Sequence, residues 1–366
     1  MNGTNTSRNS DLPLIGAQLS SAGGFPPVPQ RAVDVGAEVV QIFNTNPRIW
    51  RARVPAPGEI EAFVAGLREH RLRLFFHSTY LINLASPDRE LRRRSSEALA
   101  LALATGALAG AEAVVTHVGS HRGEAIGEAD RRVVTSISEA VTLAERSLAA
   151  EPAPGAVAAE PAPGAVAAAA SPGAAGAPAA PGAPGLLGGA GSTRPALAGG
   201  ALPALLLETG TGAGNTLGGR LEDLATLLSL EESLGLAGRL PLGICIDTAH
   251  LFAAGYPVHE QAGLEGLIER LRLLGLLERI GLVHLNDSKT PFGVRRDQHE
   301  NLGEGLIGHE GLARVVRHPA LARVPFVLEV PGADGHGPDA ANLALAKSMR
   351  VGTRKPGRPG GRGRTH

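Results

Sequence analysis

The sequence predicts an α/β fold, a single TIM (β/α)8 barrel. Short apolar runs alternate along the chain with longer amphipathic stretches, which is the pattern of βαβ units in a parallel sheet. Eight such apolar runs are present, and eight parallel strands close into a barrel. The expected strands span 14–19, 39–43, 72–77, 113–118, 204–208, 243–247, 281–285 and 325–330.

Stretches with a helical spacing of apolar residues separate these strands. An open, doubly wound parallel sheet is the alternative architecture for the same alternation. Its dinucleotide-binding form carries Gly-x-Gly-x-x-Gly after the first strand, and this sequence lacks that motif. We therefore favour the barrel and expect no nucleotide cofactor. The clearest expected helices span 59–70, 88–108, 130–149, 221–234 and 264–274.

A low-complexity segment, residues 151–200, interrupts the alternation. It begins with two copies of EPAPGAVAA and continues in Ala, Pro and Gly, so it has too little large apolar surface to offset the entropy lost on ordering. We expect a disordered insertion in a helix-to-strand connection, on the barrel face opposite the active site. The predicted division is a disordered N-terminus 1–11, one domain from 12–150 and 201–350, the insertion 151–200, and a disordered basic tail 351–366.

Bulk composition narrows the classes of function. Lys and Arg number 35, as do Asp and Glu, and zero net charge argues weakly against a nucleic-acid ligand without excluding one. The single cysteine, Cys245, excludes an intramolecular disulfide and fits a reducing compartment. No apolar run reaches the ~20 residues that cross a bilayer, and the polar N-terminus lacks the apolar stretch of a signal peptide. We expect a cytoplasmic protein without a membrane partner.

Metal-capable side chains recur where the expected strands end. The carboxyl ends of all strands in such a barrel meet on one face, which is where active sites form. A lone histidine there is more often a core residue, and a lone carboxylate often caps the next helix, but neither explanation accounts for the whole set. Six strand-end residues and three that follow closely make up this set: His77, His117, Glu208, Asp247, His284, Glu329, His250, Asp297 and His299.

The chemistry of this set favours zinc, with manganese or iron as competitors, because imidazole and carboxylate groups are mixed. Nine ligands are too many for one tetrahedral site and fit two or three metal ions. Paired metals are the usual equipment for hydrolysis of phosphate esters. The alternative is a single-metal sugar isomerase with a lysine base, but no lysine ends a strand. Lys289, which follows the seventh strand, is either a surface charge or a phosphate contact.

Aromatic and basic residues mark the rim of the expected site. Tyr80 lies just past His77, and Arg48 and Trp50 lie in the loop after the second strand. Side chains at such a rim can wedge into a base stack, which indicates DNA as a ligand. For Trp50 we prefer the interpretation that the ring packs the loop onto the barrel.

Five motifs in the chain resemble those of endonuclease IV, the zinc-dependent apurinic/apyrimidinic endonuclease family. The similarity covers residues 12–150 and 201–332, nearly all of the foldable chain. Within it, the HLND, LGEG-x-IGH and ID-T-x-H runs are specific when they occur together. The motifs are HSTYLINLASP (77–87), CIDTAHLFAAGY (245–256), HLNDSK (284–289), NLGEGLIGH (301–309) and VLEV (327–330).

The resemblance implies a TIM barrel with three zinc ions, manganese being possible at one site, in which Glu208 and Glu329 serve catalysis. It implies cleavage of double-stranded DNA on the 5′ side of an abasic site, leaving 3′-hydroxyl and 5′-deoxyribose phosphate ends, in base-excision repair. The implied ligands are His77, His117 and Glu208 for the first ion, Glu208, Asp247, His284 and Glu329 for the second, and His250, Asp297 and His299 for the third.

The resemblance also implies which residues touch DNA. Arg48 and Tyr80 would insert near the flipped-out abasic nucleotide, and Lys289 would contact phosphate. We expect a monomer, because DNA must reach one open face. A sugar isomerase or epimerase on a related barrel, and a non-catalytic DNA-binding relative, remain as alternatives.

Three positions depart from the family pattern, and none is one of the nine ligands. Gln18 stands in a Gly-Ala-Gln run where the family usually has Gly-Ala-His. Thr209 follows Glu208 where the family usually has Asn, and Glu300 follows His299 where it often has His. We expect Gln18, through weaker support of the ligands or weaker phosphate contact, to affect the rate more than the type of reaction.

The basic tail generates a first prediction. Removing residues 351–366 should weaken DNA binding mainly at low salt, because flexible Arg and Lys side chains contact phosphates without reading sequence. Binding titrations over a range of salt concentrations check this, and an unchanged salt dependence after the deletion would contradict it. Residues 350–366 hold no acid, and their basic residues are Arg350, which the deletion keeps, and Arg354, Lys355, Arg358, Arg362 and Arg364, which it removes.

Overall fold

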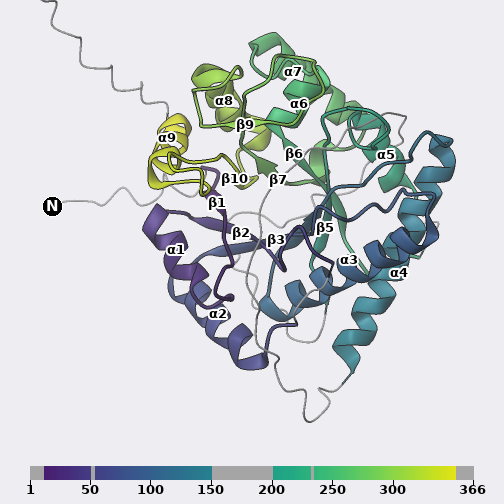
Figure 1. Cartoon of the computed structure of the whole chain (residues 1–366). Helices are drawn as coiled ribbons and strands as arrows, with labels where there is room; N and C mark the ends of the chain where they lie inside the picture. Colours follow the sequence, from purple (N-terminus) through teal and green to yellow (C-terminus); the bar gives the residue numbers. More distant parts are fainter. Residues whose placement is uncertain (1–11, 51–53, 151–200, 232–234, 352–366) are drawn as a thin grey trace, which may run out of the picture.

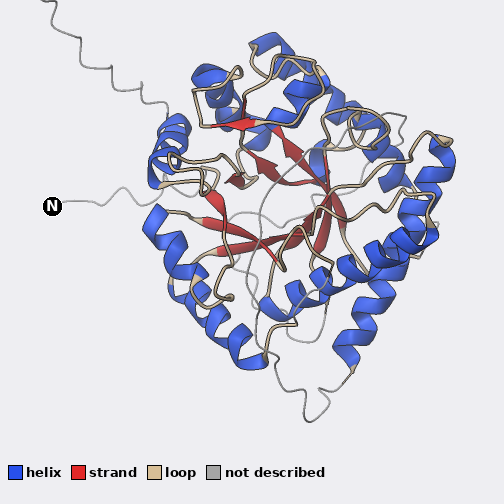
Figure 2. Ribbon diagram, viewed as in Figure 1, coloured by secondary structure: helices blue, strands red, loops and turns tan. Residues whose placement is uncertain are grey.

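A computed structural model describes residues 12–50, 54–150, 201–231 and 235–351. Eight parallel strands form a closed barrel in the order β1-β10-β7-β6-β5-β4-β3-β2, surrounded by helices (Figures 1 and 2). Two short strands, β8 and β9, pair separately. The predicted TIM barrel is confirmed. The predicted insertion and the predicted tail beyond Val351 lie outside the described residues.

The strands begin and end within a few residues of the predicted positions. The largest differences are β4 and β10, which are shorter than predicted, so His117 and Glu329 lie just after strands instead of within them. The ladder between β4 and β5 ends at Thr116, which pairs with Leu207. The strands are β1 (Ile15–Leu19), β2 (Val39–Phe43), β3 (Arg73–His77), β4 (Ala113–Thr116), β5 (Ala204–Glu208), β6 (Leu242–Asp247), β7 (Ile280–His284), β8 (Asp287–Ser288), β9 (His299–Glu300) and β10 (Phe326–Leu328).

All five predicted helices are present, and four more, α1, α6, α8 and α9, were not singled out from the sequence. The predicted helix 221–234 corresponds to α5, which ends at Ser229, and residues 232–234 lie outside the described residues. The helices are α1 (Val28–Val35), α2 (Pro57–Glu69), α3 (Arg89–Ala109), α4 (Ile126–Ala149), α5 (Leu221–Ser229), α6 (Thr248–Ala254), α7 (Gln261–Leu273), α8 (Gly308–Arg317) and α9 (Ala340–Val351).

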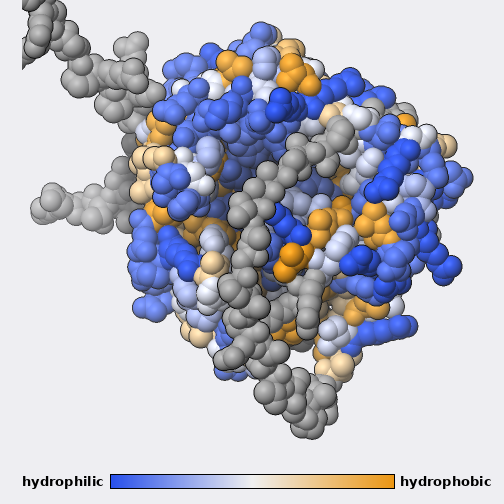
Figure 3. Space-filling model, in the orientation of Figure 1, coloured by the Kyte–Doolittle hydropathy of each residue, from blue (hydrophilic) through white to orange (hydrophobic). Residues whose placement is uncertain are grey.

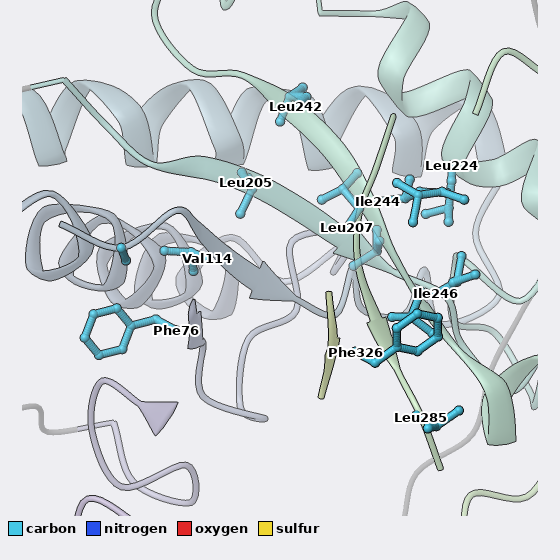
Figure 4. Close-up of a cluster of buried hydrophobic side chains, with 14 of the residues drawn as sticks. Phe76, Val114, Leu205, Leu207, Leu224, Leu242, Ile244, Ile246, Leu285 and Phe326 are labelled. Carbon is cyan, nitrogen blue, oxygen red and sulfur yellow. The ribbon is translucent and has the colours of Figure 1, made fainter. Parts of the chain in front are cut away.

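The strand side chains divide into two apolar layers. One layer faces the helices, and Figure 4 shows part of it, where Leu207 and Ile244 lie near Leu224 of α5. The smaller layer fills the barrel interior and includes Phe75, which alternates with the outward-facing side chains on either side of it. The polar residues at the carboxyl ends of the strands therefore stand on a packed apolar floor.

The outer surface is mixed. Figure 3 shows a mainly hydrophilic face with small, separate apolar groups. Among the described residues, no helix has the length and apolar character needed to cross a membrane.

One buried carboxyl outside the strand ends has an unusual environment. Asp223, in the first turn of α5, is 1% exposed. Its Oδ2 accepts hydrogen bonds from the backbone N–H groups of Gly218 and Arg220 at 3.0 and 3.3 Å, while Oδ1 has no hydrogen-bond partner among the described residues. Burial, with a smaller contribution from Asp130, raises the pKa of Asp223 to about 6.

This environment predicts a pH-dependent gain from Asp223→Asn. Because the raised pKa means that ionisation costs more in the folded state, Asp223 lowers the stability of the parent as the pH rises from about 4 to about 6. Asn keeps one oxygen for the two N–H donors and does not ionise. The free energy of unfolding of the variant relative to the parent should therefore increase by about 2–3 kcal/mol between about pH 4 and pH 7. Denaturant titrations at both pH values measure it, and a constant difference would contradict the prediction.

Candidate metal centre

The nine predicted ligands gather at the carboxyl end of the barrel. Seven of them are buried or nearly so, and eight fall into three groups whose ligand atoms lie within 4.8 Å of one another. The groups are His77, His117 and Glu208; Glu208, Asp247, His284 and Glu329; and Asp247, His250 and His299. Glu208 belongs to the first two groups and Asp247 to the last two, so the three groups are linked.

Glu208 is the centre of the first group. Its Oε2 lies 3.1 Å from Nε2 of His77 and 3.3 Å from Nδ1 of His117. The three residues come from the ends of neighbouring strands, β3, β4 and β5. One carboxylate oxygen thus faces two imidazole nitrogens.

His284 is the centre of the second group. Its Nδ1 lies 3.1 Å from Oε1 of Glu208, 3.2 Å from Oε2 of Glu329 and 3.9 Å from Oδ2 of Asp247. One ring nitrogen can donate only one hydrogen, so it cannot satisfy three carboxylates. This grouping requires a cation to offset the carboxylate charges.

The third group includes one residue that the sequence did not assign to it. Asp247 lies with His250 and His299, its Oδ2 3.7 Å from Nε2 of His299. Asp297 contacts both histidines from the open side: its oxygens lie 3.3 Å from Nε2 of His250 and 3.2 Å from Nε2 of His299. The Nε2 of His299 nevertheless has no hydrogen bond among the described residues. Nε2 of His299 therefore lies close to carboxylate oxygens without a hydrogen bond to them. Ligands that face a common metal ion are arranged in this way.

Three of the histidines have one ring nitrogen fixed by an oxygen that can only accept. Nδ1 of His77 lies 2.7 Å from the Ser78 carbonyl, and Nδ1 of His250 lies 2.8 Å from the Thr209 carbonyl. Nε2 of His284 lies 3.1 Å from Oε1 of Gln41. These contacts place the proton on that nitrogen and leave the lone pair of the other directed at the carboxylates.

The charged groups of the site shift the pKa values of one another. Burial opposes ionisation of Glu208, but His117 and His284 outweigh it and hold the pKa of Glu208 well below its usual range. Burial likewise opposes protonation of His299, but Asp297 outweighs it and raises the pKa of His299 to about 9. Excess negative charge at this end of the barrel therefore draws in positive charge.

Two amide side chains that sequence reasoning missed hold the predicted ligands in place. Gln41 on β2 accepts from His284 and donates from Nε2 to Oε1 of Glu329 at 3.1 Å. Asn286 donates to Oδ2 of Asp247 at 2.6 Å and accepts from the Glu329 backbone N–H at 2.8 Å. The HLND motif includes Asn286, but its role depends on strands distant in sequence.

Asp287, also within that motif, is a second missed residue. Its carboxylate is fully buried and accepts backbone N–H bonds of 2.9–3.2 Å from a glycine-rich loop that leads into α8. The same residue pairs with Glu300 in the β8–β9 ribbon that carries His299. Asp287 therefore fixes the loop and the ribbon next to the third group. The donors are Gly303, Gly305, Ile307 and Gly308.

The three departures from the family pattern occupy different positions. Thr209 supports the centre, because its hydroxyl accepts from the Asp247 N–H at 2.9 Å. Both amide atoms of Gln18 lack a hydrogen bond among the described residues, although Gln18 is registered with Gln41 on the neighbouring strand. Glu300 forms an ion pair of 2.8 Å with Lys289, so the predicted phosphate contact is neutralised in this structure.

The predicted rim residues lie on two connected loops. The Pro47 carbonyl, next to the exposed Arg48, accepts from the Tyr80 N–H at 3.2 Å. Tyr80 is 52% exposed, and its ring lies 5.7 Å from that of His77. Trp50 packs under Arg94 of α3, whose guanidinium is 4.8 Å from the ring centroid.

The donor set fits zinc. Every group mixes imidazole nitrogen with carboxylate oxygen, the combination that zinc accepts, and the fixed histidines expose a lone pair. The carboxylates, being buried, also require cationic charge.

Comparisons with known proteins agree with this geometry. Residues 29–162 and 203–351 match the family described as "Xylose isomerase-like TIM barrel". The chain is 31% identical to "Probable endonuclease 4" of Nitratidesulfovibrio vulgaris (strain DP4), over 92% of this chain and 99% of that protein. It is 32% identical to the protein of the same name from Solibacter usitatus, over 93% of this chain and 98% of that one.

Solved structures extend the comparison. Endonuclease IV from Thermus thermophilus is 31% identical and superposes with a TM-score of 0.67, over 93% of this chain and 100% of that chain. A D-tagatose 3-epimerase-like protein shares the fold with a TM-score of 0.56 at 15% identity. At that identity the likeness concerns the barrel alone.

The shared ligands predict unequal losses of metal. Glu208→Gln should lower the zinc content per chain about twice as much as His299→Asn, because Glu208 belongs to two groups and His299 to one. Glu304→Gln, which changes an exposed acid outside the groups, is the matched control. Elemental analysis of zinc-loaded, dialysed proteins measures the content. Equal losses in the first two variants would contradict the linked arrangement.

Proposed function

The chain belongs to the endonuclease IV family, and from this membership we propose that it hydrolyses the phosphodiester bond on the 5′ side of abasic sites in DNA. Family membership makes it a metal-dependent endonuclease with a DNA substrate. The use of three zinc ions, the 3′-hydroxyl and 5′-deoxyribose phosphate products, the role in base-excision repair and the monomeric state are parts of our proposal.

The observation that carries the proposal is the linkage of the three ligand groups through Glu208 and Asp247. His77 and His117 would hold the first ion with Glu208, and His284 and Glu329 the second. The third would lie between His250, His299 and the carboxylates of Asp247 and Asp297. Zinc ions in such an array activate water and offset the charge of a phosphate under attack.

Residues of the chain itself would orient this machinery. Gln41 and Asn286 together hold both oxygens of Glu329, through bonds of 3.1 and 3.4 Å, so its carboxylate has one preferred direction. Fixed ligands lower the cost of reorganisation during the reaction. Asp287 would do the same for the ribbon that carries His299.

The rim supports DNA as the substrate. Arg48 is exposed on a loop tied to that of Tyr80, and the Tyr80 ring centroid lies 5.7 Å from that of His77 and 6.0 Å from that of His117. A base stack opened by these two side chains would place its phosphates over the ligand groups. Lys289 lies beside the third group and would contact a phosphate once released from Glu300.

A sugar isomerase or epimerase with one divalent metal is the second candidate, because proteins with such names share the fold. One metal would leave most of the nine gathered side chains without a role. In particular, it would not explain the third group. We therefore place this candidate second.

The proposal predicts chelator-sensitive incision. Zinc-loaded protein should cut a duplex carrying one abasic site on its 5′ side, leaving an end that a DNA polymerase extends. Prior treatment with a chelator should abolish the cut, and added zinc should restore it, because the ligand groups lose their charge compensation without metal.

A matched undamaged duplex is the substrate control, and Glu304→Gln is the protein control. No incision by protein that holds three zinc ions would contradict the proposal. Turnover of a ketose or aldose by protein with one bound metal ion would favour the second candidate instead.

A further inference from the structure

A charge pair stands beside the third ligand group on the β8–β9 ribbon. The strands pair antiparallel, with Ser288 opposite His299 and Asp287 opposite Glu300. The Lys289 N–H extends the pairing with a 2.9 Å bond to the Gln298 carbonyl. This places the ammonium of Lys289 2.8 Å from Oε2 of Glu300, across the ribbon and one residue from the ligand His299.

The two partners differ in exposure and in the hydrogen bonds that hold them. The side chain of Lys289 is 56% exposed, whereas that of Glu300 is 19% exposed. Oε1 of Glu300 also accepts the Asn301 N–H at 3.0 Å, which fixes the carboxylate in place. Lys289 can therefore turn toward solvent, but the negative charge stays.

The rest of this loop carries cations without such a partner. Arg295 and Arg296 are exposed, and neither forms an ion pair with a residue that the structure describes. The loop is held to α6 by backbone bonds from Gly293 to Phe252 and from Arg295 to Ala253, of 3.1 and 2.9 Å. Of these three cations, only Lys289 is neutralised within the described chain.

We propose that Glu300 sets the affinity for DNA by competing with a DNA phosphate for Lys289. A phosphate that binds Lys289 must displace Glu300 and then lie close to its fixed carboxylate. Both effects weaken binding. Because Glu300 already neutralises the charge of Lys289, contact between Lys289 and a phosphate also releases few counterions from the DNA. This inference rests on the proposed function, because it assumes that DNA crosses the third ligand group.

The consequence is that Glu300 weakens the binding of damaged and undamaged DNA alike. A phosphate contact carries no sequence information. Weaker backbone contact shortens the residence time on undamaged DNA and on the cut product. Glu300 stands where the family often has histidine, so this weakening of DNA binding distinguishes the chain from relatives with a neutral residue at that position.

The test is a double-mutant cycle on DNA affinity. Full-length, zinc-loaded protein is titrated with a short undamaged duplex, which is not cut, at salt concentrations from about 50 to about 200 mM. Glu300→Gln should bind about threefold to tenfold more tightly at the lowest salt. The plot of log affinity against log salt should become steeper by about 0.9, the value of one phosphate contact.

Lys289→Gln alone should weaken binding, and Glu300→Gln should increase affinity less in the Lys289→Gln background than in the parent, because only the repulsion of the phosphate is then relieved. Glu304→Gln is the matched control, because Glu304 is an exposed acid in the following loop that forms no ion pair with a described residue. It should change affinity less than Glu300→Gln and leave the salt slope unaltered.

Three results would overturn the inference. They are an unchanged slope in Glu300→Gln, an equal gain in Glu304→Gln, and a gain from Glu300→Gln that is as large in the Lys289→Gln background as in the parent. Failure of the proposed function is distinguishable, because parent protein would then neither bind the duplex nor cut abasic DNA. Parent activity with no effect of Glu300→Gln refutes only the role of Glu300.

Discussion

The carboxylate of Glu208 is the contact on which the rest of the site depends. It is buried at the end of β5 and faces imidazoles that come from β3, β4 and β7. A buried carboxylate is costly unless it is compensated, and Glu208 has Asp247 and Glu329 as close neighbours. The barrel brings these charges together because its strands end on one face, and cationic charge is what makes that arrangement stable. The metal-dependent function that we propose follows from this need for cationic charge.

A set of neutral side chains turns the charged cluster into an ordered site. Gln41 and Asn286 fix the direction of Glu329, and Thr209 holds both Asp247 and His250 through its hydroxyl and its carbonyl. Such outer contacts orient metal ligands and tune their basicity. Gln18, beside Gln41, makes no such contact with the described residues, and nothing in the structure explains the substitution.

The barrel and the gathering of the metal-capable side chains could be predicted from the sequence, because both depend on a local pattern, an apolar run followed by a metal-capable residue. The sequence does not predict Gln41, since the role of Gln41 depends on its position across strands from His284 and Glu329. Helix α6 was missed because it begins directly after Asp247, whose side chain accepts the His250 N–H, with no intervening loop. The pairing of Asp247 with the third group likewise depends on three-dimensional proximity. The sequence predicts a phosphate contact for Lys289 but not its ion pair with Glu300. That pair forms across the β8–β9 ribbon, which the sequence does not predict.

The most direct measurement is an anomalous-scattering map of crystals of the zinc-loaded protein at the zinc absorption edge. We predict three peaks, with Glu208 beside two of them and Asp247 also beside two. A single peak, or separate peaks that share neither carboxylate, would contradict the claim that these residues form one linked metal centre.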